Sequence, residues 1–203
     1  QLINSDKFEV YQHSEFELLN VYYDTPEYDL RRLDIGLRTR ATITAQGGQC
    51  EQTVKLAGKD VGGLHQRPEH TVSLGAGDKD TFFADLDLYD ASIWPRGVDI
   101  RHIQGQLSKL FETDFQRQVW RVRLPSGTKV ECVLDQGQVR VEGRSLPLCE
   151  VELELLEGRV SDVFQFAYQL AEKLPLKLGA QSKAARGYQL LAQHTNTCSN
   201  LEM

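Results

Sequence analysis

The sequence predicts an α+β protein, an eight-stranded antiparallel β-barrel with helices packed on the outside. Short segments rich in β-branched and aromatic residues follow one another, separated by turn signals, which favours an antiparallel barrel or sandwich. Strand after strand carries its charged residues on one face. The helices are amphipathic and need an apolar sheet face to cover, so we expect a barrel with apolar faces outward and charged faces lining a tunnel.

The expected strands form two groups along the chain. The first group comprises 16–23, 36–43, 49–57 and 68–74, with Gln46-Gly47-Gly48 as a hairpin turn. The second group comprises 114–124, 128–134, 138–142 and 146–156. Within it, Pro125-Ser126-Gly127 and Asp135-Gln136-Gly137 are turn signals, so the hairpin-like order continues to the end of the group.

Three segments are expected to be helices: 161–173, 182–193 and, with a weaker pattern, 99–111. Ser161 and Ser182 stand where N-cap residues are favoured, and Pro175 follows the end of the first helix. Residues 75–98 are expected to be a loop or short-helix connection. We expect a single domain over 1–203, with a polar tail from 194 to 203.

Composition excludes some classes of protein. A formal net charge of −6 argues against a dedicated nucleic-acid coat, so no nucleic-acid partner is expected. The sequence has no run of about 18 apolar residues, so no membrane partner is expected either. The four cysteines show neither CxxC spacing nor the density of a secreted scaffold, which favours a reduced, cytoplasmic location.

Carboxylates stand at every second position of "CEVELELL" (149–156). In a strand, Glu150, Glu152 and Glu154 therefore share one face, with roughly 7 Å between successive residues. Like charges this close raise each other's pKa unless something compensates them. Clustered carboxylates attract hard divalent cations such as Mg²⁺ or Mn²⁺, so this strand is a candidate metal-binding segment.

Basic residues line the charged faces of other strands. "GLRTRAT" places Arg38 and Arg40 opposite Leu37, and "EQTVKLA" places Lys55 on the polar face of its strand. An ordinary half-solvated sheet is the alternative interpretation for any one strand, but repetition over many strands weakens it. Guanidinium and ammonium groups bind phosphate oxygens, and carboxylates bind the accompanying metal. Together they predict a site for a metal–polyphosphate complex.

Eight motifs in order resemble the CYTH, or triphosphate tunnel metalloenzyme, family, and most closely its bacterial inorganic triphosphatases. The resemblance runs from about Leu19 to Tyr188. The motifs are "NVYYDTP" (20–26), "GLRTR" (36–40), "TVKLAG" (53–58), "GLHQRPEH" (63–70), "DFQRQVW" (114–120), "VECVLDQGQV" (130–139), "CEVELELLEG" (149–158) and "SKAARGY" (182–188).

The resemblance implies an eight-stranded antiparallel tunnel that binds a linear triphosphate and hydrolyses it with Mg²⁺ or Mn²⁺. It implies that phosphates are held by Arg38, Arg40, Lys55, Arg67, Arg117 and Lys183. Metal ligands would be Glu150, Glu152 and Glu154, and supporting tunnel acids would be Glu69, Glu131 and Asp135. Glu152, Glu154 and Lys183 are the expected catalytic residues, with a carboxylate-oriented water attacking the terminal phosphorus.

Two features of the family lie outside the motifs of this chain. The family opens with a Glu-x-Glu-x-Lys strand, and none precedes Asn20. We expect that strand upstream of Gln1; the alternative is a chain that lacks half of the metal site. In the family a helical histidine-rich domain can follow the tunnel domain, and whether one follows Met203 stays open. Other functions stay open: a class IV-type adenylate cyclase, a thiamine or nucleoside triphosphatase, or a non-catalytic polyphosphate-binding module.

Overall fold

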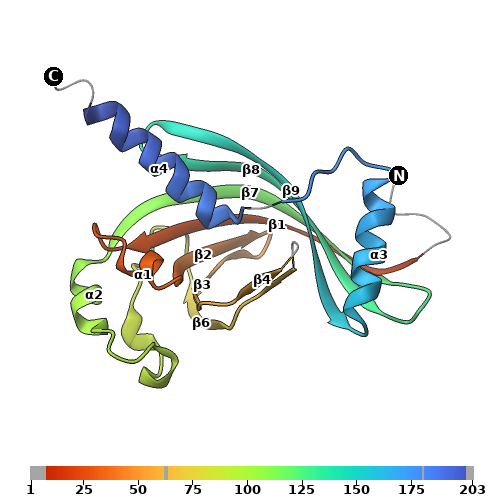
Figure 1. Cartoon of the computed structure of the whole chain (residues 1–203), viewed down its shortest axis with the longest axis horizontal. Helices are drawn as coiled ribbons and strands as arrows, with labels where there is room; N and C mark the ends of the chain where they lie inside the picture. Colours follow the sequence, from red (N-terminus) through yellow and green to blue (C-terminus); the bar gives the residue numbers. More distant parts are fainter. Residues whose placement is uncertain (1–7, 62–63, 180, 200–203) are drawn as a thin grey trace. The chain divides into compact units, whose positions relative to one another are not determined.

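The computed structural model describes residues 8–61, 64–179 and 181–199 and is rich in β-strands (Figure 1). Seven of them form one antiparallel sheet. Its members are β1 (Glu9–Asp24), β2 (Gly36–Thr44), β3 (Gly47–Lys55), β6 (Glu69–Ala76), β7 (Ser108–Arg123), β8 (Lys129–Val141) and β9 (Arg144–Glu157). A separate two-stranded sheet pairs β4 (Lys59–Val61) with β5 (Leu64–Gln66).

The order of strands in the large sheet is β6-β3-β2-β1-β7-β8-β9. Register brings polar residues of neighbouring strands opposite one another. Arg40 on β2 faces Asn20 on β1 and Glu51 on β3. Lys55 on β3 faces Glu69 on β6. Long-range pairing thus places basic and acidic residues in the same rows of the sheet.

The expected closed barrel is wrong. Strands β6 and β9 are the two edges of the sheet, and among the described residues no strand pairing joins them into a barrel. The count of eight strands treated 128–134 and 138–142 as separate, with a turn at Asp135-Gln136-Gly137. In the structure, β8 runs unbroken through this segment. Its neighbours β7 and β9 pair with it on both sides, and this pairing outweighs the local turn preference.

The helices are α1 (Asp29–Arg32), α2 (Ile100–Gln106), α3 (Val160–Ala171) and α4 (Lys183–Ser199). The predicted cap at Ser182 is confirmed, because the backbone N–H of Ala185 donates to Ser182 Oγ at 3.1 Å. The predicted cap at Ser161 is wrong, since Arg159 holds the N-cap position without a side-chain cap bond. Short 3₁₀ turns at Leu86–Leu88 and Ala91–Ile93 fit the expected connection at 75–98.

Two predicted helix ends differ from the structure. The helix expected over 99–111 ends at Gln106, because β7 begins at Ser108 and takes the following residues into the sheet. The helix expected to end at 193 continues to Ser199, so part of the predicted polar tail is helical. Element boundaries are the least reliable part of a prediction from sequence, and both errors are of this kind.

Contacts divide the chain into two compact units. Unit 1 comprises Gln1–Phe16, Phe115–Gly137 and Pro147–Gly179. Unit 2 comprises Glu17–Asp114, Gln138–Leu146 and Ala180–Met203. Strands β1, β7, β8 and β9 contribute residues to both units.

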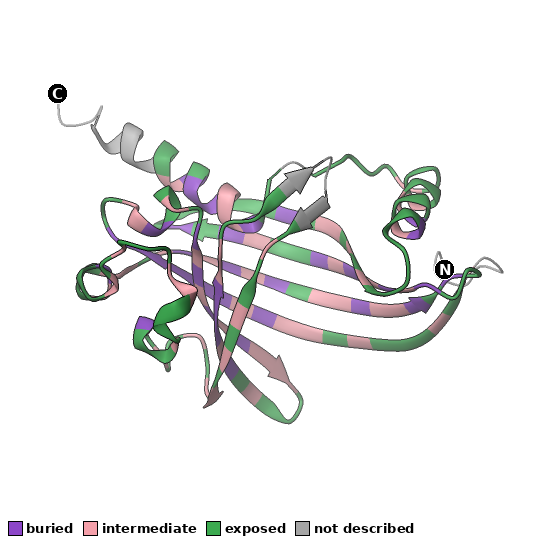
Figure 2. Ribbon diagram, turned by 60° about the horizontal axis from the view of Figure 1, so that its bottom comes forward, coloured by how far each residue is buried: buried purple, intermediate pink, exposed green. Residues whose placement is uncertain are grey.

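Each unit has its own apolar core. In unit 1, Val130 and Cys132 on β8 pack with Phe166 of α3. In unit 2, Leu37 and Val54 on the sheet pack with Leu86 and other residues of the segment between β6 and β7. Figure 2 shows buried and more exposed residues alternating along the long strands. The expectation that helices pack on the apolar strand faces is thus confirmed for α3 in unit 1 and for Ile103 of α2 in unit 2.

Candidate functional site

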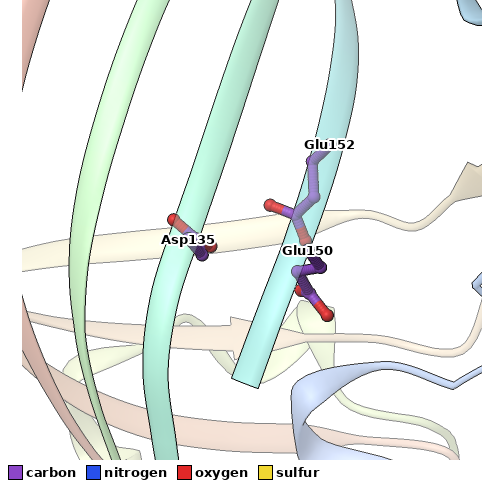
Figure 3. Close-up of side chains that lie close together, drawn as sticks. All are labelled: Asp135, Glu150 and Glu152. Atoms are coloured by element: carbon purple, nitrogen blue, oxygen red, sulfur yellow. The ribbon is translucent and has the colours of Figure 1, made fainter. Parts of the chain in front are cut away.

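Three carboxylates of unit 1 form what we call the acidic cluster: Asp135 on β8, with Glu150 and Glu152 on β9 (Figure 3). One oxygen of each lies within 4.8 Å of the others. Asp135 is buried, Glu150 is half-buried and Glu152 is exposed. Glu150 and Glu152 share a face because they are two residues apart, and the neighbouring strand β8 adds Asp135. Oxygen ligands at this spacing suit Mg²⁺ or Mn²⁺.

Arg117 on β7 holds the acidic cluster together. Its Nε and Nη2 donate to the two carboxylate oxygens of Asp135 at 2.8 and 2.7 Å, a bidentate pair. Nη2 also donates to Glu152 Oε2 at 3.3 Å. Burial lowers the pKa of Arg117, but the hydrogen bonds and charge of Asp135, followed by the charge of Glu152, outweigh it and raise the pKa overall. Arg117 is therefore cationic, and the four groups together carry a formal charge of −2, which suits a divalent cation.

Of the predicted acids of unit 1, the structure brings three together and leaves two outside that group. Glu150 and Glu152, predicted as metal ligands, lie together with Asp135, which was predicted as a supporting acid. Glu154 is exposed further along β9, and among the residues that the structure describes it is not a member of the acidic cluster. Glu131 instead accepts a hydrogen bond from Arg121 Nε at 3.0 Å.

Arg40 of unit 2 is oriented by a buried amide. Its Nε donates to Asn20 Oδ1 at 2.7 Å, and its Nη1 lies 3.8 Å from Glu51 Oε1. Asn20 is 1% exposed and donates in turn to Thr113 Oγ1 at 2.8 Å. The sequence analysis did not single out Asn20. The sequence feature that could have identified Asn20 is its position as a lone amide within the apolar run "LLNVYY", where a buried polar group needs a partner.

Arg38, on the same strand, has a buried Nε with no hydrogen-bond partner. It lies opposite Tyr22 on β1 and Thr53 on β3. Leaving a buried guanidinium N–H without an acceptor is costly, and native proteins do so rarely. An anionic ligand oxygen would supply the acceptor. This nitrogen is the clearest sign in unit 2 of a site for a ligand.

Lys55 and Arg67, also predicted to hold phosphate, are each paired with a carboxylate. Lys55 Nζ lies 2.6 Å from Glu69 Oε1, and Arg67 Nη1 lies 2.9 Å from Asp34 Oδ1. Both pairs are partly exposed to solvent. Pairs of this kind contribute about 0–1 kcal/mol to stability, so exchanging the carboxylate for a phosphate oxygen costs little.

Lys183, the last of the predicted phosphate ligands, is the first residue of α4 and is 7% exposed. It lies on the same helix face as Gly187 and Leu190, which are also buried. The position of its ammonium group therefore depends on how this face of α4 packs within unit 2.

A profile of the CYTH domain matches residues 1–188 of the chain. The chain belongs to the CYTH family. Among curated relatives, this CYTH chain is 33% identical over 184 residues to the inorganic triphosphatase of Haemophilus influenzae. That alignment covers 91% of the chain and 49% of the relative, so the chain spans about half the length of the curated relative it matches.

Two solved structures share the fold of this CYTH chain. The PH1819 protein from Pyrococcus horikoshii OT3 has a TM-score of 0.51 and 18% identity, covering 91% of this chain and 89% of that one. A putative adenylyl cyclase from Hippeastrum, with a dominant triphosphatase activity, has a TM-score of 0.56 and 17% identity, covering 87% and 83%. Likeness at these identities shows the fold alone. Among the helices of the described residues, none is long and apolar enough to cross a membrane.

Proposed function

We propose that this CYTH chain hydrolyses a linear triphosphate, inorganic triphosphate, with Mg²⁺ or Mn²⁺ bound at the acidic cluster. The observation that carries the proposal is the cluster of Asp135, Glu150 and Glu152 with the Arg117 guanidinium against it. The likeness to a relative named as an inorganic triphosphatase supports the same substrate.

Within unit 1 the three carboxylates would be the metal ligands. A bound divalent cation supplies charge neutralisation and Lewis acidity toward phosphate oxygens. Arg117 keeps Asp135 in place through its two hydrogen bonds. Glu152 is the exposed member, and we propose that its carboxylate accepts a hydrogen bond from the attacking water and orients it. Glu154 lies outside the cluster, so we assign the metal to the other three.

Within unit 2 we propose that basic side chains hold phosphate oxygens. Arg38 would satisfy its buried Nε with a phosphate oxygen, and Arg40 would present its guanidinium from the orientation set by Asn20. Lys55 and Arg67 would exchange their carboxylate partners for phosphate. We propose the same role for Lys183. Positioning and charge neutralisation are the main contributions that proteins make to phosphoryl transfer.

The test is phosphate release by the full-length protein from inorganic triphosphate, ATP and thiamine triphosphate, with Mg²⁺ or Mn²⁺. We expect inorganic triphosphate to be cleaved most efficiently. Glu152→Gln should abolish turnover with an unchanged circular-dichroism spectrum, because glutamine keeps the size of the side chain but loses the charge. Glu157→Gln is the matched control, since Glu157 is exposed on the same strand and pairs with Lys129. It should keep wild-type turnover.

Each other outcome points to a different function. Faster cleavage of ATP or thiamine triphosphate would make the chain an organic triphosphatase. Formation of cyclic AMP from ATP would make it an adenylate cyclase. Tight binding of triphosphate without turnover would make it a polyphosphate-binding module. Full activity of Glu152→Gln would show that the acidic cluster is not the metal site.

A further inference from the structure

Gly187 allows α4 to approach β7 unusually closely within unit 2. A Cβ atom at this position would lie 2.1 Å from Phe111 Cε2 and 2.5 Å from Phe111 Cζ, far inside van der Waals contact. The Phe111 ring cannot easily move away. It is 3% exposed, stacks on Tyr22 with ring centroids 4.7 Å apart, and meets the ring of Tyr188 edge-on at 5.2 Å. Glycine is therefore required at 187 for this packing.

Tyr188, the next residue, anchors the same turn of α4. Its hydroxyl donates to Asp24 Oδ2 at 2.8 Å, and both residues are buried. The guanidinium carbon of Arg31 lies 4.4 Å from the centroid of the Tyr188 ring, within cation–π range. Burial, followed by the Asp24 charge, raises the pKa of Tyr188 above its usual value, so the hydroxyl keeps its proton and its role as donor.

Asp24 is itself held rigidly. It is 0% exposed, and its carboxylate accepts backbone N–H groups of Thr25, Leu30 and Arg31 at 2.8, 2.9 and 3.0 Å. It therefore ties the turn after β1 and the start of α1 to one point. Because α4 is hydrogen-bonded to Asp24 through Tyr188, the fixed position of Asp24 also fixes this turn of α4.

We propose that Tyr188 is a positioning residue for Lys183: its hydrogen bond to Asp24, with the close approach at Gly187, sets where α4 presents that lysine to triphosphate. Lys183 and Gly187 are four residues apart and share a helix face, so the contact at Phe111 bears directly on the lysine. Tyr188 lies about 7.5 Å further along the helix axis than Lys183, within one rigid stretch. The inference rests on the proposed function, because it takes Lys183 as a phosphate ligand.

A hydrogen bond between α4 and the end of β1 could also do no more than stabilise the fold. The two roles differ in what happens when Lys183 is replaced. If Tyr188 acts through the lysine, removing its hydroxyl matters little once the lysine is gone. If it only stabilises unit 2, the loss is the same with or without the lysine. Residues that act through one another are non-additive in this way.

The experiment measures KM and kcat for inorganic triphosphate in the full-length protein carrying Tyr188→Phe, Lys183→Met or both. Phenylalanine keeps the ring contacts with Phe111 and Arg31 and removes only the hydroxyl. We expect Tyr188→Phe to raise KM about tenfold with a much smaller change in kcat, and to add less than about twofold on the Lys183→Met background. Tyr168→Phe, which alters a tyrosine that is 73% exposed on α3, should change neither. Equal effects in both backgrounds, or an unchanged KM, would overturn the proposal.

A second measurement does not need activity. The acetylation rate of Lys183, followed by peptide mass spectrometry, should be slow in the wild type because the residue is 7% exposed, with exposed Lys177 as internal reference. Tyr188→Phe and Gly187→Ala should each raise it about tenfold relative to Lys177, in protein whose melting curve is still cooperative. An unchanged rate refutes the positioning role. If the wild type neither binds nor cleaves triphosphate, the proposed function fails while the labelling result stands.

Discussion

Replacing Asp135 by asparagine removes the carboxylate that pairs with Arg117. Asp135 is 0% exposed and the Arg117 side chain is 17% exposed, so this is a buried ion pair. Asparagine has one acceptor oxygen and turns an NH₂ group toward the guanidinium, so the bidentate geometry is lost. Removing one partner of a buried pair costs about 3–5 kcal/mol. We expect about 3 kcal/mol, because Glu152 still faces Arg117 at 3.3 Å.

Glu131→Gln is the matched comparison. It also removes one negative charge from β8 next to an arginine of β7, here Arg121. The Arg121 side chain is 43% exposed, however, and pairs of this kind contribute about 0–1 kcal/mol. The difference between the two variants therefore isolates the effect of burial from the effect of charge.

The assay is urea unfolding of the wild type and both variants without divalent metal. We expect Asp135→Asn to lower the free energy of unfolding by about 3 kcal/mol and Glu131→Gln by less than about 1 kcal/mol. Mn²⁺ at a hundred times its Kd should then stabilise the wild type by about 2.7 kcal/mol and Asp135→Asn by less, because a ligand is missing. Equal losses in the two variants would refute the reasoning from burial.

Two further predictions concern single titrating groups. Burial raises the pKa of the Cys132 thiol to about 11, so about one Cys132 side chain in a thousand is a thiolate at pH 8. Timed peptide mapping with iodoacetamide should therefore show exposed Cys149 reacting well before Cys132. Rapid labelling of Cys132 would contradict this. Hydrogen bonds from Thr128 and Ser126 lower the pKa of Asp162 from 3.8 to about 2. The ionised carboxylate therefore stabilises the folded state above about pH 4, and this contribution is lost as the pH falls toward 2. Asp162→Asn should flatten the fall in stability between these pH values, and an unchanged slope in acid unfolding would count against it.

The alternation of side chains along strands was correctly predicted from the sequence, because it is a local property of extended chain. Leu37 was expected opposite Arg38 and Arg40, and it packs in the core of unit 2. The cap at Ser182 depends only on residues within one turn, and it was also correct. Features set within a few residues of each other could thus be inferred without the tertiary structure.

The length of strands and the closure of the sheet could not be inferred in this way. Asp135-Gln136-Gly137 has the composition of a turn, yet β8 continues through it because strands on both sides pair with it. Counting it as a turn produced an eighth strand. Pairing between distant segments outweighs local propensity in sheets, so local signals alone misplace the strand ends.

The sequence predicted one part of the acidic cluster, and only the tertiary structure showed the other. Spacing in "CEVELELL" put Glu150 and Glu152 on one face, and the structure brings them together. The sequence could not show that Asp135 completes the cluster while Glu154 remains outside it, because that choice depends on which residues β8 and β9 set side by side. The sequence by itself determined which side chains share a strand face. The tertiary structure decided which of them meet, since only long-range pairing and burial bring Arg117 onto Asp135 and Tyr188 onto Asp24.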